Sequence, residues 1–413
     1  MADVEGLGAR RAALHLLDAV LRQGRTLESA AQGIRLAPPD AALALAIAGE
    51  ALRRLPDLDE RIDSATRQRL PDDAKARMVL RLALAQKAGL GTPDHALVAT
   101  ALPLVAGGPR RLVHGVLGTL LRQWVDLPDP PALPADVEQR WARAWGDAMV
   151  LAARRAIGRR PPLDLSFKSD AEAQAYPLGI SLAPRHRRIV SASVQALPGF
   201  DAGGWWVQDI AASLPARLMP AAPADVLDLC AAPGGKTMQL AAAGLSVTAL
   251  DRSESRLARL ADNLARTGLT ADLVAADALD WPAPRRFDAV LLDAPCSATG
   301  TFRRHPEVLY RARPAIIVES AALQSRLIDR AATMLKSGGT LVYAVCSLEP
   351  EEGEAMVAAF LARNTAFRLV PPRPGELPDG VTSSPEGWVQ VLPGMLEGDG
   401  GLDGFFVARL ARA

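Results

Sequence analysis

Cysteine and lysine are both scarce in this chain. Only 3 of the 413 residues are cysteine, which excludes a disulfide-stabilised scaffold and suits a reducing compartment, where a remaining thiol is a candidate for chemistry. Lysine occurs at five positions, although lysine and arginine together number 47. A GC-rich genome is the simplest explanation for this arginine excess, and the planar guanidinium also suits phosphate and base stacking. The formal net charge of +1 neither favours nor excludes a nucleic-acid partner.

Long apolar runs and targeting patterns are also missing. No stretch approaches ~18 uncharged apolar residues, so no membrane span is expected. Asp3 and Glu5 precede Arg10, which does not fit a secretory signal. With 49% hydrophobic and 23% charged residues, the composition is typical of ordinary globular domains and excludes dominant disorder. We expect a cytoplasmic protein, and the length predicts two or three domains.

The order of the patterns predicts three parts. Residues 1–127 carry apolar stripes at helical spacing and no alternating strand pattern, which predicts an all-α bundle. A proline-rich run at 127–134 marks the clearest boundary. Residues 128–204 are predicted to form a linker and a small α+β subdomain that begins with a helix over 137–157. Residues 205–413 are predicted to form a Rossmann-like α/β domain.

The prediction for the last part comes from alternating strands and helices. Short apolar strands are expected at 225–229, 246–250, 273–277, 287–293 and 339–345, with helices such as 253–267 and 315–335 between them, and the run 404–410 completes the domain. Such alternation is typical of a parallel sheet covered by helices on both faces. In these sheets, ligands bind outside the carboxyl ends of the strands. The candidate functional residues therefore lie just after the strands.

The first candidate is the run Asp-Leu-Cys-Ala-Ala-Pro-Gly-Gly-Lys-Thr at 228–237, a strand-to-helix turn. Two glycines allow close approach of a ligand to the backbone, and the helix N-terminus offers N–H groups. A phosphate-binding loop is excluded because Cys230 stands where that motif needs glycine, and the dinucleotide pattern G-x-G-x-x-G also fails. A nucleotide-like ligand without a long phosphate chain is favoured over a purely structural turn.

Two aspartates follow the next two strands. Asp251 stands where a carboxylate would hold the hydroxyl pair of a ribose. Asp277 lies one strand further along, within reach of an adenine amino group. Either residue alone is equally well explained as a helix N-cap. Together with the glycine turn, they predict an adenosine pocket.

Two of the three cysteines follow two further strands. Cys296 lies in the run Asp-Ala-Pro-Cys-Ser-Ala-Thr-Gly that begins at Asp293, and Cys346 lies in a second Cys-Ser pair. A single cysteine is most often a small buried apolar residue. Two thiols at adjacent strand ends beside a carboxylate instead predict thiol chemistry.

Methylation of a pyrimidine at carbon 5 needs such a set of groups. Carbon 5 is a poor nucleophile, but a thiolate that adds to carbon 6 makes the ring enamine-like, so that carbon 5 can attack an electrophilic methyl. A carboxylate can hydrogen-bond the ring nitrogen and the exocyclic amine. A base then removes the proton on carbon 5 and the thiolate leaves, with the target base unstacked throughout. These arguments do not rank the two cysteines.

The three motifs strongly resemble those of the bacterial ribosomal RNA cytosine-5 methyltransferases of the Fmu/Sun (RsmB-like) type. The resemblance implies a NusB-like RNA-binding domain at the N-terminus, with Cys346 as the nucleophile on cytosine carbon 6, assisted by Asp293. It implies that Cys296 assists product release, and that the run Arg-Arg-His-Pro at 303–306 lies on the RNA face. It also implies S-adenosylmethionine held by Cys230, Ala231, Ala232, Pro233, Gly234, Gly235, Lys236, Asp251, Asp277 and Asp293.

The expected function is therefore methylation of a cytosine in small-subunit ribosomal RNA by a monomer that needs no metal and no membrane. Two features depart from the family pattern: Val345 replaces a threonine before the nucleophile, and the segment 162–168 differs from the family's. A transfer RNA cytosine-5 methyltransferase would share all the catalytic residues. The two departures also leave open a non-catalytic RNA-binding or ribosome-assembly factor. The low net charge leaves RNA affinity to local basic patches.

Overall fold

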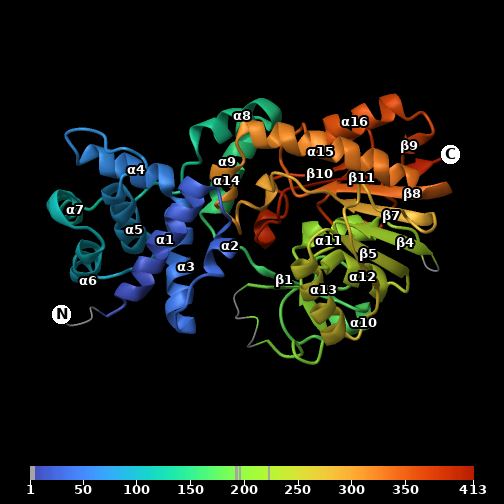
Figure 1. Cartoon of the computed structure of the whole chain (residues 1–413), viewed down its shortest axis with the longest axis horizontal. Coiled ribbons are helices and arrows are strands. Elements are labelled where there is room, and N and C mark those ends of the chain that lie inside the picture. The colour runs from blue at the N-terminus through green and yellow to red at the C-terminus, as the bar shows by residue number, and fades with distance from the viewer. Residues whose placement is uncertain (1–4, 191–193, 195–196, 222–223) are drawn as a thin grey trace. The chain divides into compact units, whose positions relative to one another are not determined.

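The chain folds into two compact units in a computed structural model, which describes residues 5–190, 194, 197–221 and 224–413. One unit comprises Met1–Arg160 together with Phe302–Arg313, and the other comprises Pro161–Thr301 together with Pro314–Ala413. Figure 1 shows the elements of both units. The polypeptide therefore leaves the second unit once and returns to it.

The first unit is helical, and its described residues contain no strand. The central helix α5 is buried along most of its length and packs against α1, α3, α4, α6 and α7. The predicted all-α bundle is thus confirmed. Its helices are α1 (Leu7–Gln23), α2 (Leu27–Ala31), α3 (Pro38–Arg53), α4 (Leu55–Ser64), α5 (Lys75–Leu90), α6 (Asp94–Ala101), α7 (Gly107–Arg122), α8 (Ala135–Trp145), α9 (Asp147–Ile157) and α14 (Val308–Arg311).

Two arginines of α5 are buried and neutralised by carboxylates. The Arg77 guanidinium donates to Asp63 at 2.6 Å, and Arg81 donates to Asp59 at 2.7 Å. Buried charges persist only where they are paired and hydrogen-bonded, and the hydrogen bond from Arg77 lowers the pKa of Asp63. Part of the arginine content of the sequence therefore serves the core of this unit.

The helix predicted over 137–157 is two helices in the structure. Between α8 and α9 lies Gly146, with a φ of 82°. Glycine adopts this left-handed conformation without steric cost, and it ends the first helix. The apolar periodicity continues on both sides, which is why the sequence pattern alone reads as one element.

The segment Phe302–Arg313 belongs to this helical unit. The rings of Phe302 and Trp141 meet with centroids 5.4 Å apart, and the Tyr310 hydroxyl donates to the Leu52 carbonyl oxygen at 2.8 Å. Glu307 accepts a hydrogen bond from a backbone N–H of α2 at 3.3 Å. The basic run at 303–306 therefore belongs to the helical unit, although in the chain it directly follows the motif that contains Cys296.

The second unit begins with a three-stranded antiparallel sheet in the order β2-β1-β3. Its elements are β1 (Leu163–Phe167), α10 (Asp170–Ala175), β2 (His186–Ile189) and β3 (Trp205–Val207). On the central strand, buried Asp164 accepts two hydrogen bonds from Arg188, both at 2.7 Å, and one from the Ile210 N–H at 3.0 Å. The divergent segment 162–168 is therefore an ordered strand tied to the helix that begins at Ile210. Of the residues predicted as a linker and α+β subdomain, those up to Arg160 belong to the helical unit and those from Pro161 to the second unit.

The large sheet has the order β10-β11-β8-β7-β4-β5-β6, and β9 pairs with β11. The five predicted strands pair in parallel, whereas the C-terminal run pairs antiparallel with β8. The Rossmann-like fold is confirmed, with an antiparallel edge of the kind common on such sheets. The strands are β4 (Asp225–Leu229), β5 (Ser246–Asp251), β6 (Asp272–Ala275), β7 (Phe287–Asp293), β8 (Leu335–Val345), β9 (Phe367–Leu369), β10 (Val389–Val391) and β11 (Phe405–Arg412).

Helices cover both faces of this sheet (Figure 1). Along β7, Val290 and Leu292 join the core beneath α15 and α16, while Ala289 and Leu291 join the core beneath α11 and α12. After β4 the chain moves outward through β5 and β6, then returns to β7 beside β4. This reversal opens a crevice at the carboxyl ends of the strands. The helices are α11 (Ile210–Arg217), α12 (Gly235–Ala242), α13 (Glu254–Thr267), α15 (Pro314–Thr333) and α16 (Glu354–Arg363).

Candidate active site

The turn between β4 and α12 is held in a conformation that needs glycine. Gly234 has a φ of +105°, and a Cβ there would lie 2.0 Å from a methyl carbon of Leu260. The Asp251 carboxylate accepts hydrogen bonds from the N–H of Ala232 at 3.2 Å and of Ser253 at 2.9 Å. The end of β5 therefore fixes the turn that follows β4, and the same carboxylate is placed at the crevice.

One cavity brings together the residues predicted to hold an adenosine. It has a volume of about 120 Å³ and is lined by Cys230, Asp251 and Asp277. Asp277 accepts the Leu279 N–H at 2.9 Å, so its carboxylate also orders the turn after β6. Apolar side chains complete the wall, from Leu250, Ala278, Pro295, Leu323 and Leu327, together with Arg252 and Arg256. Carboxylates facing an apolar slot are groups that fit a ribose and an adenine.

Lys236, at the start of α12, pairs with the carboxylate that ends β7. Its ammonium lies 2.7 Å from Asp293 Oδ2 and 5.2 Å from the centre of the Phe405 ring. Burial opposes the charged ammonium, but Asp293 and the sulfur of Cys346 outweigh it, and the pKa of Lys236 is raised. A fixed positive charge therefore lies near the Cys346 sulfur.

The structure brings the two candidate cysteines into contact. The sulfurs of Cys296 and Cys346 are 3.4 Å apart, and both side chains are half-buried rather than sealed. The hydrogen bond with Cys346, and then burial, raise the pKa of Cys296 well above its usual range. Burial likewise raises the pKa of the third thiol, Cys230, to about 12. Cys296 and Cys230 therefore keep their protons at neutral pH.

Two buried carboxylates near the site were not selected from the sequence. Asp228 lies under the turn, where Thr237 donates to one of its oxygens at 2.6 Å and the other oxygen has no partner in the described structure. Burial raises its pKa to about 7. Glu352, just before α16, is fully buried beneath the two cysteine loops. Asp228 belongs to the first motif, but only the fold shows that Glu352 approaches both cysteines.

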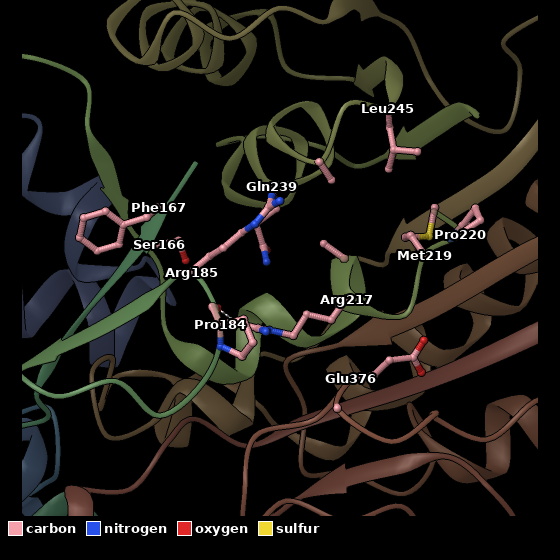
Figure 2. A pocket seen from close by; sticks show the side chains of 13 residues that line it. Ser166, Phe167, Pro184, Arg185, Arg217, Met219, Pro220, Gln239, Leu245 and Glu376 are labelled. Atoms are coloured by element: carbon pink, nitrogen blue, oxygen red, sulfur yellow. Dashed lines mark hydrogen bonds between the residues drawn. The ribbon is translucent and has the colours of Figure 1, made fainter. Parts of the chain in front are cut away.

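A separate hollow, shown in Figure 2, is lined by residues that precede the strands β4 and β5, such as Pro220 and Leu245. It encloses about 300 Å³, and Arg185, Arg217, Gln239 and Glu376 are among the side chains that line it. Figure 2 shows Arg217 extending to Pro184, whose carbonyl oxygen accepts a hydrogen bond from it at 2.8 Å. None of the predicted site residues lines this hollow.

The described parts of the chain offer neither a cluster of side chains for a metal ion nor a helix able to cross a membrane. No cluster of three or more histidine, cysteine, aspartate or glutamate side chains there is arranged to bind a metal ion. Across the same residues, no helix combines the length and the apolar character that crossing a membrane requires.

The fold, the strand-end crevice and the paired thiols define the class as a Rossmann-like methyltransferase. Residues 215–411 match the family model for the 16S rRNA methyltransferases RsmB/F, and residues 7–122 match the NusB family. The ribosomal RNA small subunit methyltransferase B of Citrobacter koseri is 34% identical, over 98% of each chain. The enzyme of the same name from Cronobacter sakazakii is 32% identical, over 99% of each chain.

Solved structures agree with this match. A methyltransferase homologue from Pyrococcus horikoshii superposes with a TM-score of 0.56 at 25% identity, over 72% of this chain and 98% of that one. Another solved structure gives a TM-score of 0.73 over 99% of both chains, and its 23% identity supports the fold alone. The chain therefore belongs to the RsmB/F family of ribosomal RNA methyltransferases. It is an RNA methyltransferase of the kind that uses S-adenosylmethionine, with a NusB-type helical domain.

Proposed function

We propose that this enzyme methylates carbon 5 of a cytosine in small-subunit ribosomal RNA through a covalent bond between Cys346 and cytosine carbon 6. The observation that carries the proposal is the 3.4 Å separation of the Cys296 and Cys346 sulfurs at the ends of β7 and β8. The Lys236–Asp293 ion pair lies at the same sheet edge. Two thiols, a carboxylate and a cation are the groups that this reaction needs.

The reaction begins when the Cys346 thiolate adds to carbon 6, which forms a sulfur–carbon bond and moves the ring's double-bond electrons toward carbon 5 and the ring nitrogen. Asp293 accepts a hydrogen bond from the exocyclic amine and orients the ring. S-adenosylmethionine, when bound, supplies the electrophilic methyl that carbon 5 attacks. A base then takes the proton from carbon 5, the bond to Cys346 breaks, and the double bond between carbons 5 and 6 re-forms.

The electrostatics of the pair support different roles for the two cysteines. The hydrogen bond to Cys346 is the largest cause of the raised pKa of Cys296. Once Cys346 is bonded to the base it is a neutral thioether and no longer accepts this hydrogen bond. The Cys296 thiol can then release its own proton to solvent, and the thiolate that forms accepts the proton from carbon 5.

The groups proposed to hold S-adenosylmethionine surround the turn from Cys230 to Lys236. Asp251 and Asp277 face the apolar slot, where the first would hold the ribose hydroxyls and the second the adenine amino group. Asp293 lies beyond the turn, toward the cysteines. These side chains fit the cofactor by charge and by position, and they are the site residues of the proposal.

The relatives named as small subunit methyltransferases support ribosomal RNA as the substrate. We assign RNA docking to residues 1–127, a connecting role to 128–204 and catalysis to 205–413. Val345, the departure beside the nucleophile, is fully buried in the core on the α15 and α16 side of β8. Cys296 packs against this same core, whereas Cys346 packs against the core on the other face of the sheet. An apolar side chain at 345 therefore fits its surroundings.

Cysteine variants test the covalent route. Cys346→Ala is expected to lower methyl transfer more than about 10³-fold, because the nucleophile is lost. Cys296→Ala is expected to accumulate a covalent protein–RNA complex that survives denaturing electrophoresis, because the carbon 5 proton is not removed. The double variant Cys296→Ala, Cys346→Ala is the matched control and should form no such complex. A Cys346→Ala enzyme with full turnover would contradict the assignment.

The substrate is tested by methyl transfer to RNA from cells that lack this protein. We expect incorporation of labelled methyl into 16S ribosomal RNA, either naked or in particles, at one cytosine that bisulfite sequencing reads as protected. Incorporation only into transfer RNA would establish the alternative substrate. No incorporation into any RNA, together with retained RNA binding, would favour a non-catalytic assembly factor.

A further inference from the structure

The Glu352 carboxylate is fully buried and surrounded by hydrogen-bond donors. Its Oε1 accepts from the Ser297 N–H at 2.9 Å and from the Gln324 amide at 3.0 Å. Its Oε2 accepts from the hydroxyls of Ser297 and Ser347. An ionised carboxylate is a pure acceptor, and four donors offset part of the cost of burying it, while burial still raises the pKa of Glu352.

The two serines are the residues that follow the two active-site cysteines. Ser297 comes directly after Cys296, and Ser347 directly after Cys346. Their hydroxyl oxygens lie 3.1 Å apart, and the Gly300 N–H also donates to the Cys346 carbonyl oxygen at 3.0 Å. One carboxylate therefore joins two loops that are about fifty residues apart in sequence, and it explains why both motifs read Cys-Ser.

We propose that Glu352 is a positioning residue that holds the two Cys-Ser loops together, so that the thiols of Cys296 and Cys346 stay close enough to act in succession on one base. The inference deepens the proposed function and rests on it for the catalytic consequence. Glu352 reaches the sulfurs only through the serines, since its own oxygens are occupied by Ser297, Ser347 and Gln324. The alternative is that the same hydrogen bonds stabilise the fold without setting the distance between the sulfurs.

The equilibrium for forming a Cys296–Cys346 disulfide reports how close the two thiols stay, and it is measured without RNA or cofactor. The whole protein is equilibrated with oxidised and reduced glutathione, where two protein thiols and one oxidised glutathione give one protein disulfide and two reduced glutathiones. Alkylation and mass analysis of peptides then report the fraction of Cys296–Cys346 disulfide. We expect Glu352→Ala to lower this equilibrium constant by about tenfold, because the thiols spend less time in contact. Glu352→Gln, which keeps the length and one acceptor oxygen, is expected to restore part of the loss.

Thermal unfolding shows whether each variant is folded. If Glu352→Ala does not fold, Ser347→Ala, which removes only one hydroxyl, still tests the proposal. It is expected to shift the disulfide equilibrium in the same direction. Ser213→Ala is the control, since the Ser213 hydroxyl is equally buried and donates to a backbone carbonyl in α11, away from the cysteines. Folded Ser347→Ala and Glu352→Gln proteins that both keep the wild-type equilibrium would overturn the proposal.

The catalytic consequence is measured separately. In Glu352→Ala we expect kcat for methyl transfer to fall by about 100-fold, while KM for RNA and for S-adenosylmethionine changes less than threefold. A shifted disulfide equilibrium in a protein whose wild-type form methylates no RNA would sink the proposed function and leave the positioning role intact. An active wild type whose Glu352→Ala variant keeps both kcat and the disulfide equilibrium would sink the positioning role alone.

Discussion

The two halves of the catalytic sheet edge hold their charged groups in opposite ways. In the β4–β6 half, Asp251 and Asp277 each accept an N–H from the residue two positions further along the chain. In the β7–β8 half, Asp293 is held by Lys236, 57 residues away, and the two sulfurs come from loops 50 residues apart. The first half is ordered by contacts within 19 residues, whereas the second joins segments 50 or more residues apart. Substitutions should therefore affect binding in one half and catalysis in the other.

The largest effect is expected for Lys236→Met, which removes the partner of Asp293 in the β7–β8 half. The change leaves the half-buried Asp293 carboxylate without its partner and removes the positive charge near Cys346. We expect kcat for methyl transfer to fall by about 10³-fold with little change in KM for RNA. The control is Lys336→Met, which breaks an exposed pair with Asp288 that has the same 2.7 Å separation. Equal losses in both variants would contradict a special role for the buried pair.

The next effect concerns Asp228 and depends on pH. Burial raises the pKa of Asp228 to about 7 in the folded protein, so the unfolded chain gives up this proton first as the pH rises. The contribution of Asp228 to the free energy of unfolding should fall by at most about 4 kcal/mol between pH 4 and 7. Above pH 7 it should stay at this lower value. Asp228→Asn should remove this dependence, as measured by urea unfolding at pH 4.5, 6 and 8.

Asp288→Asn is the control for the direction of this pH dependence, because the pKa of Asp288 is shifted the opposite way. Hydrogen bonds from Lys336 and from the Asp225 N–H lower the pKa of Asp288. Its contribution to stability is therefore present above the unfolded-state pKa and is lost as the pH falls through the folded-state value. Replacing it should cost stability at pH 8, the opposite direction to Asp228→Asn. Parallel pH profiles for the two variants would contradict the burial argument.

The smallest effect is expected in the locally ordered half. Asp251→Asn keeps one acceptor for the turn and removes the charge, so we expect KM for S-adenosylmethionine to rise by about tenfold with kcat nearly unchanged. Asp272→Asn, at the exposed start of β6, is the control. Steady-state kinetics at saturating RNA separate the two parameters. A loss of kcat rather than a rise in KM would mean that the two halves do not act separately.

The same difference explains what the sequence could predict. Short contiguous stretches of sequence predict strands such as β4 and β5. They also predict the glycine turn between β4 and α12. The helical bundle and the Rossmann-like domain follow from periodicity and alternation in the same way. The helix break at Gly146 was not predicted, because the apolar stripe continues on both sides of this glycine. The roles of the two cysteines, with Cys346 as the nucleophile and Cys296 in product release, were implied by the family resemblance and not by the residues alone.

Contacts between distant segments were not predictable. Nothing in the run around Glu352 indicates that its carboxylate lies under Cys296 and Cys346, because the approach depends on the pairing of β7 with β8. The antiparallel direction of β11 is likewise set by the path of the chain after α16. Sequence order also placed 303–306 with the catalytic motifs, whereas the packing of Phe302 and Tyr310 assigns it to the helices.

That last assignment has a practical consequence for dividing the protein. The helical unit is discontinuous, since it needs both Met1–Arg160 and Phe302–Arg313. A fragment that ends at Arg160 would expose the surface that Phe302 and Tyr310 cover, and a fragment that starts at Pro161 would carry that insert without its packing partners. Separating RNA binding from methyl transfer by simple truncation should therefore yield two damaged pieces, and point substitutions are the sounder tool.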